Sequence, residues 1–172
     1  MDATKRRQRI LETINRDSAP TSASALAKEL GVSRQVIVGD IALLRAQGHE
    51  IIATARGYMV PDFQTPNQYI GKIACCHDTD NTKAELYTIV DLGATVVNVI
   101  VEHELYGEII GQLNIKTRDD ADDFVRQAKL SEAKLLSALT LGVHLHTIAC
   151  RNKTHFDQVH QALHNAGFLV QN

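Results

Sequence analysis

The chain has 172 residues, of which 44% are hydrophobic, and a formal net charge of −2 at pH 7. This apolar fraction is typical of a globular protein, and the length is enough for one ordinary domain or two small ones. No apolar run is long enough to span a membrane, and no apolar segment follows the basic residues near the N-terminus, so we expect no signal peptide. Three cysteines, two of them adjacent, do not make a disulfide framework, and they favour the cytoplasm as the compartment.

Charge is distributed unevenly along the chain. Residues 1–60 carry nine Lys and Arg against six Asp and Glu, whereas residues 61–172 carry nine against fourteen. A basic front half joined to an acidic back half indicates that only the front half meets a polyanion.

The first 60 residues have the pattern of a winged helix-turn-helix. Their apolar spacing and capping residues predict helices over Lys5–Asn15, Ala23–Leu30 and Ser33–Leu44. Gly31 ends the second helix, so the second and third helices form the helix-turn-helix unit. His49–Val60 then predicts two short strands around a turn near Arg56 and Gly57, which would be the wing.

This pattern identifies candidate DNA contacts. The early residues of the second helix of such a unit reach base edges in the major groove, and here they are Ser33, Arg34 and Gln35. Arginine reads guanine and glutamine reads adenine by paired hydrogen bonds. Arg56, near the wing tip, is placed to contact phosphate or the minor groove. The alternative is a small helical domain without a DNA partner. The segment resembles the winged helix of many bacterial regulators, including biotin-operon repressors, which implies a double-stranded operator as partner.

Residues 61–68 are the predicted linker, and residues 69–172 the second domain. We expect a loosely structured stretch over residues 130–141. The other segments predict strands and helices in the order β-α-β-β-α-β with a final helix, at residues 69–77, 84–92, 95–101, 108–115, 118–129, 142–148 and 152–166. That order is typical of an α+β fold, specifically a ferredoxin-like α/β sandwich.

Within this domain one set of residues favours metal binding. His144 and His146 lie two apart in a predicted strand and therefore point to the same face. His77 ends the first strand, and Glu85 lies in the first turn of the next helix. If the His144 strand pairs near the first strand, three imidazoles and one carboxylate converge, a set that suits zinc, nickel, iron or manganese. The alternative is two histidines on the solvent face of an edge strand.

The remaining histidines and the cysteines receive simpler interpretations. Cys75, Cys76 and Cys150 are interpreted as small buried hydrophobic residues. His155, His160 and His164, on the last helix, are predicted to face solvent.

The second domain resembles a known family, the three-histidine (3H) domain. In niacin-responsive transcriptional repressors (the NiaR family) this domain is fused to a winged helix. The matching segments are His77 with Glu85, YTIVDLGATVVNVIVEH at 87–103, YGEI at 106–109, TRDDADDF at 117–124 and LSALTLGVHLHTI at 136–148. Two departures lie in predicted turns: Glu104 and Leu135 or Leu136 stand where the family usually has proline.

The resemblance implies a set of properties for this chain. It implies metal ligands at His77, Glu85, His144 and His146, with nickel or zinc favoured, and His103 as the remaining signature histidine. It also implies a homodimer that represses NAD-biosynthesis and niacin-uptake genes, with nicotinic acid as corepressor.

For the effector we predict three further contacts. Arg118 can pair bidentately with the carboxylate of the effector, and His103 and Tyr106 can flank its pyridine ring. Each has a purely structural alternative. Arg118 would be a surface arginine at the start of a helix, His103 a core histidine whose hydrogen bonds are satisfied, and Tyr106 a tyrosine packed in a turn.

Two other functions compete with the effector-responsive repressor. In a pure metal sensor the ion itself would be the signal. A metal-dependent hydrolase fused to the DNA-binding domain would use an open coordination position. The sequence has no Ser/His/Asp arrangement and no phosphate-binding glycine loop, so we expect no enzyme activity.

Overall fold

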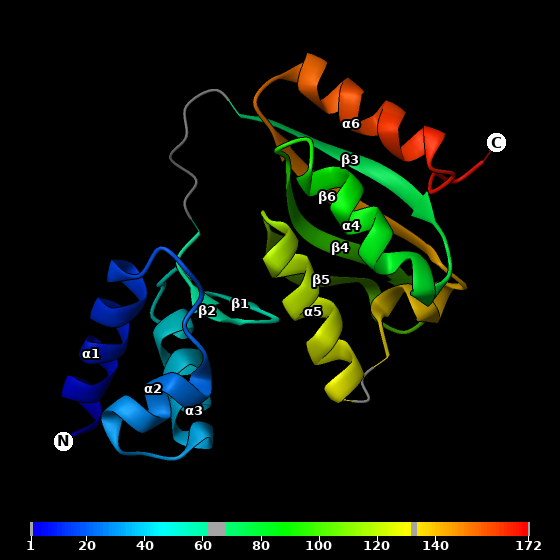
Figure 1. The fold of residues 1–172 in the computed structure, drawn as a ribbon. Helices are drawn as coiled ribbons and strands as arrows, with labels where there is room; N and C mark the ends of the chain where they lie inside the picture. Colours follow the sequence, from blue (N-terminus) through cyan, green and yellow to red (C-terminus); the bar gives the residue numbers. More distant parts are fainter. Residues whose placement is uncertain (1, 62–67, 132–133, 172) are drawn as a thin grey trace. The chain divides into compact units, whose positions relative to one another are not determined.

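The computed structural model describes residues 2–61, 68–131 and 134–171. The chain folds into two compact units, Met1–Gln64 and Thr65–Asn172 (Figure 1). The predicted linker, 61–68, falls mostly outside the described residues. No helix in the described ranges is long and apolar enough to cross a bilayer.

The first unit is built from helices followed by a hairpin, as predicted. Its elements are α1 (Ala3–Arg16), α2 (Ala23–Leu30), α3 (Arg34–Ala46), β1 (Ile52–Thr54) and β2 (Gly57–Met59). Ser22 and Ser33 are the N-caps of α2 and α3, and each side chain accepts a hydrogen bond from a backbone N–H in the first turn. Gly31 ends α2 in the left-handed conformation with φ of 65°. Aliphatic side chains of the three helices form the core, among them Ile10, Leu26, Ile37 and Ile41.

Two polar features hold this unit together. Asp40 on α3 is buried and lies 2.6 Å from Nε of Arg6 and 3.5 Å from Nη1 of Arg7, so α1 is ion-paired to α3. The hairpin is joined to the helices because Thr21 and Tyr58 exchange two backbone hydrogen bonds of 2.9 Å. A Cβ at Gly57 would lie 2.4 Å from the backbone of Thr21, so the wing can approach this closely only with glycine there.

The second unit is an α+β sandwich. Its elements are β3 (Tyr69–Cys76), η1 (Thr79–Asn81), α4 (Thr82–Val90), β4 (Thr95–His103), β5 (Gly107–Ile115), α5 (Arg118–Leu130), η2 (Leu136–Thr140), β6 (Val143–Cys150) and α6 (Lys153–Asn165). Within the described residues the strands form one antiparallel sheet in the order β3-β6-β4-β5. The α+β class and the β-α-β-β-α-β order are confirmed. Because β6 lies between β3 and β4, the first βαβ unit is split, and the sandwich has β6 and β4 as its central strands.

The helices cover one face of this sheet, with α4 between α5 and α6 (Figure 1). The core between the layers joins Leu86 and Ile89 of α4 and Leu163 of α6 to Val96 and Ile148 of the sheet. Thr117 caps α5 and forms a capping box with Asp120, which accounts for an acidic residue in the first turn without any metal.

The stretch predicted to be loose, 130–141, is more ordered than expected where it is described. Leu136–Thr140 forms η2, and Ser137 is buried. Gly142 follows with φ of 94°, and a Cβ at this position would lie 2.3 Å from the carbonyl oxygen of His77. Glycine is therefore required where the chain enters β6, because the backbone passes directly against the end of β3.

Candidate functional site

Strand pairing brings the predicted metal ligands together. β3 and β6 are antiparallel neighbours, with Cys75 opposite His144 and Ile73 opposite His146. His144 and His146 point to the helix-covered face and are buried. His77 follows the end of β3, next to Gly142. Glu85 comes from the first turn of α4, which packs on this face of the sheet.

Glu85 is the centre of the cluster. Its side chain is 1% exposed, and those of His77, His144 and His146 are 4%, 2% and 4% exposed. Nε2 of His77 lies 2.5 Å from Glu85 Oε2, and Nε2 of His144 and His146 lie 3.1 and 3.2 Å from Oε1. The His144 ring is packed edge-on against both other imidazoles, with centroid distances of 5.0 Å to His77 and 4.8 Å to His146.

Backbone carbonyls orient all three rings in the same way. Nδ1 of His77 donates to the carbonyl of Asp78 at 2.7 Å, Nδ1 of His144 to Gly142 at 2.8 Å, and Nδ1 of His146 to Asn98 at 2.9 Å. A carbonyl oxygen only accepts, so each Nδ1 carries the proton. In the neutral imidazole Nε2 is then left as a lone-pair donor, and all three Nε2 atoms face the Glu85 carboxylate.

The charge of the cluster is set by burial and by this pairing. Burial alone would raise the pKa of Glu85, but when the imidazoles are protonated the charge of His146 and the hydrogen bonds from His144, His146 and His77 outweigh it and hold the pKa well below its usual range. Burial likewise lowers the pKa of His77, but the hydrogen bond to Glu85 and the charge of Glu85 raise it overall. His77 and Glu85 thus each favour their charged form.

This donor set fits a transition-metal ion. Three imidazole nitrogens and one carboxylate oxygen converge, and each imidazole has its other nitrogen bonded to the backbone, as histidine ligands of metals usually do. Neutral imidazoles that face a carboxylate need protons or a cation between them. Metal binding itself stays a prediction.

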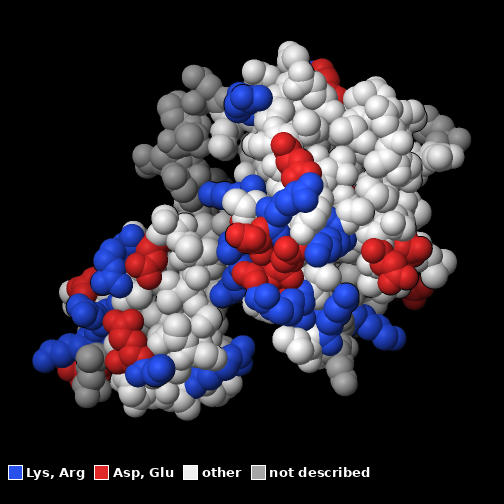
Figure 2. All heavy atoms as spheres, viewed as in Figure 1, with Lys and Arg blue, Asp and Glu red and all other residues white. Residues whose placement is uncertain are grey.

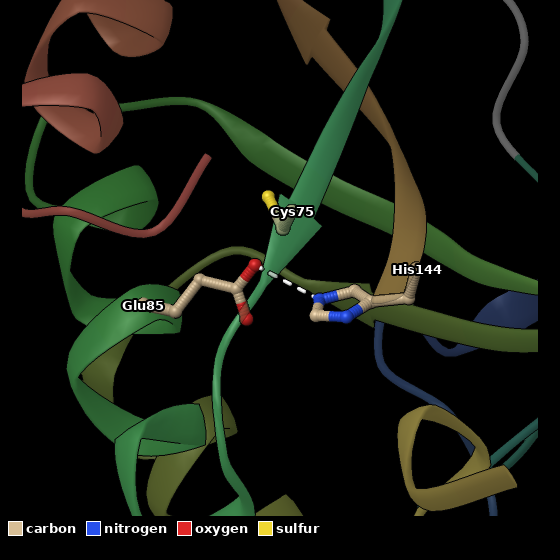
Figure 3. Close-up of side chains that lie close together, drawn as sticks. All are labelled: Cys75, Glu85 and His144. Carbon is tan, nitrogen blue, oxygen red and sulfur yellow. Dashed lines mark hydrogen bonds and ion pairs between the residues drawn. The ribbon is translucent and has the colours of Figure 1, made fainter. Parts of the chain in front are cut away.

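Cys75, interpreted from the sequence as a small buried residue, is a neighbour of the site. Its sulfur and ligand atoms of Glu85 and His144 all lie within 4.8 Å of one another. Figure 3 shows the Glu85 carboxylate facing the His144 ring, with Cys75 on the adjacent strand beside them. Burial, followed by the charge of Glu85, raises the pKa of this thiol, which favours its neutral form. Once β3 and β6 are paired in register, Cys75 must share a face with His144, but the register is not readable from the sequence.

The interpretation of the cysteines as small buried residues is correct for Cys75 and Cys150, whereas Cys76 is only partly buried.

An inner cavity of about 40 Å³ lies beside the cluster. His77, Glu85, His144 and His146 form one side of it. The other lining residues are mostly apolar and come from α4, the sheet, α5 and η2: Thr82, Leu86, Val99, Leu113, Phe124, Leu135, Leu136 and Ser137. Apolar walls with a few convergent polar groups are typical of small-molecule sites.

The predicted effector contacts lie elsewhere. His103 and Tyr106 are brought together at the β4–β5 turn, with ring centroids 5.1 Å apart, and His103 Nδ1 accepts hydrogen bonds from the backbone N–H groups of Leu105 and Tyr106. Neither residue lines the inner cavity. The His103 ring thus organises its own turn.

Arg118 is also outside the cavity lining, and its guanidinium is engaged. Nε and Nη2 lie 2.7 and 2.5 Å from the two carboxylate oxygens of Asp91, and the group stacks on Tyr87. Hydrogen bonding to Arg118 lowers the pKa of Asp91. Figure 2 shows basic and acidic side chains interspersed around α5, the helix that Arg118 begins. The contact of Arg118 with an effector stays a prediction.

The predicted DNA contacts occupy the expected positions of the first unit. Arg34 and Gln35 are exposed in the first turn of α3. Ser33 accepts a hydrogen bond from Val36 N–H as the N-cap of that helix. Arg56 lies in the turn between β1 and β2, with its backbone N–H donated to the Thr54 hydroxyl. DNA contact by these residues stays a prediction.

One histidine prediction is wrong. His155 on α6 is buried, whereas His160 and His164 are exposed as predicted. Nε2 of His155 donates to the carbonyl of Leu92 at 2.7 Å, and its Nδ1 accepts from the N–H of Arg151 at 3.1 Å. The ring therefore connects the end of α4 to the start of α6, a long-range contact that local periodicity does not reveal.

Comparison with known proteins places these two units in known families. The HTH domain family matches residues 6–59, and the 3H domain family matches residues 70–172. The chain is 40% identical over 168 residues to a protein of Bacillus subtilis named "Transcription repressor NadR", with 96% of this chain and 93% of that protein covered. It is 36% identical over 167 residues to a protein of Thermotoga maritima named "Probable transcription repressor NiaR", with 97% and 94% covered.

The chain belongs to the NiaR family of transcription repressors. The resemblance noted from the sequence is thereby confirmed, and both relatives match over nearly their whole length. Membership in this family, with its HTH domain, makes the protein a DNA-binding regulator and not an enzyme. The hydrolase alternative is set aside on this ground.

Proposed function

We propose that this protein represses NAD-biosynthesis and niacin-uptake genes, with nicotinic acid as corepressor and a bound divalent metal, nickel or zinc, in the 3H domain. The DNA-binding domain would extend over residues 1–60 and the regulatory domain over residues 69–172, with a linker at 61–68. The proposed partner is double-stranded operator DNA, bound by a homodimer in the cytoplasm.

One observation carries the metal in this proposal. His77, His144 and His146 each donate Nδ1–H to a backbone carbonyl, so three Nε2 lone pairs meet the Glu85 carboxylate in a buried position. These four residues would hold an ion between β3, α4 and β6, beside the inner cavity, and the ion would supply a Lewis-acid centre for a ligand atom.

The inner cavity supports a small planar effector. Val99, Leu113, Phe124 and Leu136 supply apolar surface for a ring, and the ion would attract a carboxylate or a pyridine nitrogen. Bound effector would favour one conformation of the dimer, and with it the spacing of the two winged helices that matches the operator half-sites.

The test is calorimetric titration of nicotinic acid into metal-loaded and chelator-stripped protein, paired with operator-binding assays on the same samples. Metal-dependent binding that tightens operator binding is the expected result. Binding of equal strength to both forms would exclude the ion from the effector site, and no binding to either would exclude nicotinic acid as the effector.

A metal sensor is the second candidate, because the cluster is nearly closed. With side chains at most 4% exposed, the ion alone would change the packing of β3 against α4. In that case metal without nicotinic acid would be enough to switch operator binding.

A further inference from the structure

Thr82, the first residue of α4, has a buried hydroxyl for which the described part of the structure offers no hydrogen-bond partner. The residue is 9% exposed. An unpartnered buried hydroxyl is costly, since it has lost its hydrogen bonds to water and made none in return. Such a group either destabilises the folded state or finds its hydrogen-bond partner in a molecule that binds from outside the chain.

Other hydroxyl groups at helix starts make the bonds expected of them. Ser22, Ser33 and Thr117 accept hydrogen bonds from backbone N–H groups as N-caps. Thr88, on the same helix as Thr82, donates to the carbonyl of Ala84 at 2.8 Å. Thr82, the first residue inside α4 after the N-cap Asn81, differs from all four because its hydroxyl makes no hydrogen bond among the described residues.

The position of Thr82 indicates where its partner would come from. Thr82 precedes Glu85 by three residues, so both lie on the same face of α4, and both line the inner cavity. Thr82, Phe124 and Leu135 also line an outer groove at the surface. These three residues therefore form the wall that the inner cavity and the outer groove share.

The outer groove carries more positive than negative charge. Its lining includes Lys83, Lys129 and Lys134 against a single acidic residue, Asp80, among the residues that the structure describes there. Lys83 is ion-paired with Asp122 at 2.8 Å, so its charge is partly neutralised. A small anion is attracted to such a groove, and Thr82 is the polar side chain it meets at the shared wall.

We propose that the Thr82 hydroxyl is a specificity-determining contact, which donates a hydrogen bond to the carboxylate of a small aromatic acid that enters through the outer groove and places its ring against Phe124 and Leu136. This assignment rests on the proposed function, because it names how the effector is read. A carboxylate supplies the acceptor that the hydroxyl lacks, and the lysines along the groove favour an anionic ligand over a neutral amide.

The test is calorimetric titration of nicotinic acid into the full-length, nickel-loaded protein, as wild type and as Thr82→Val, Thr82→Ser and Thr88→Val. Valine keeps the shape of threonine and removes the hydroxyl, so Thr82→Val is expected to weaken binding about tenfold or more. Thr82→Ser should stay within about threefold of wild type, because the hydroxyl is retained. Thr88→Val, the matched control on the same helix, should bind as wild type does.

Two further readouts separate a ligand contact from a structural role. The nickel content and the melting temperature of Thr82→Val should equal or exceed those of wild type, since the variant loses only an unpartnered hydroxyl.

Equal affinity of wild type and Thr82→Val for nicotinic acid would overturn the Thr82 assignment and leave the proposed function intact. Loss of nickel from Thr82→Val would overturn it as well, because Thr82 would then support the metal. No binding by wild type would overturn the proposed effector itself, together with this assignment.

Discussion

The cluster of His77, Glu85, His144 and His146 in the second unit and the start of α3 in the first unit are organised in opposite ways. The cluster is buried, and each histidine is oriented by a backbone carbonyl, so its geometry is set by the fold before anything binds. Arg34 and Gln35 are exposed at the start of a capped helix, and their side chains can adapt to a partner. A substitution in the cluster should therefore have a large, all-or-none effect, whereas one at the start of α3 should have a graded effect.

The sharpest test of this difference is Glu85→Gln. Glutamine keeps the shape of the side chain but removes the negative charge that the three imidazoles share, so metal affinity is expected to fall by at least about 100-fold. Metal content after dialysis and competition with a chromogenic chelator measure the change. Glu102→Gln, an exposed carboxylate on β4, is the control and should keep the wild-type affinity. Wild-type metal content in Glu85→Gln would remove Glu85 from the site.

Gly142→Ala tests whether the close backbone contact orients the cluster. A Cβ there would meet the His77 carbonyl oxygen at 2.3 Å in a residue with φ of 94°, so we expect a loss of about 2 kcal/mol or more in the free energy of unfolding, together with weaker metal binding. Chemical denaturation measures the former.

Gly93→Ala is the matched control for Gly142→Ala. Gly93 has φ of 80° and nothing within 4 Å of the added Cβ, so only the conformational cost of about 1 kcal/mol is expected and metal binding should be unchanged. Equal effects of the two substitutions would mean that the contact with His77 is unimportant.

Metal affinity should fall as the pH drops through the histidine range, because protons compete for the Nε2 atoms. The pKa of His77 is lowered by burial but raised overall by Glu85, so proton competition at this ligand begins above the ordinary histidine pKa. Glu85 stays ionised in this range, since the histidines hold its pKa well below the usual value against the effect of burial. The expected loss is about tenfold per pH unit for each histidine that must release a proton. Metal titrations from pH 7.5 to 5.5, with circular dichroism to show that the protein stays folded, measure it; a constant affinity would contradict histidine ligation.

The smallest expected effect on the fold is at the DNA-binding unit. Arg34→Ala should weaken specific operator binding by about 1–3 kcal/mol, because one bidentate base contact is lost while the fold is unaffected. Titrations of operator and of random DNA at the same salt concentration measure the effect. Equal loss on both DNAs would make Arg34 a phosphate contact, and a complete loss of binding would contradict the graded behaviour expected of an exposed site.

Local sequence patterns were enough for most of the secondary structure. α2 has the predicted bounds, and Ser33 and Thr117 are the predicted helix caps, because capping and apolar periodicity act over a few neighbouring residues. The likeness of LSALTLGVHLHTI and its companion segments to the 3H domain was likewise carried by the sequence, and the comparisons confirmed the family.

Tertiary structure decided what depends on residues far apart in the chain. The register of β3 against β6 puts Cys75 opposite His144, the carbonyl of Asn98 orients the His146 ring, and His155 is buried between α4 and α6. Thr82 is separated from Phe124 by 42 positions, yet both line the same cavity. The physical reason is that the sequence alone determines which side chains are available and which face of a helix or strand they share. The packing of elements that are distant in the chain determines which faces meet and which polar atoms are left without a partner.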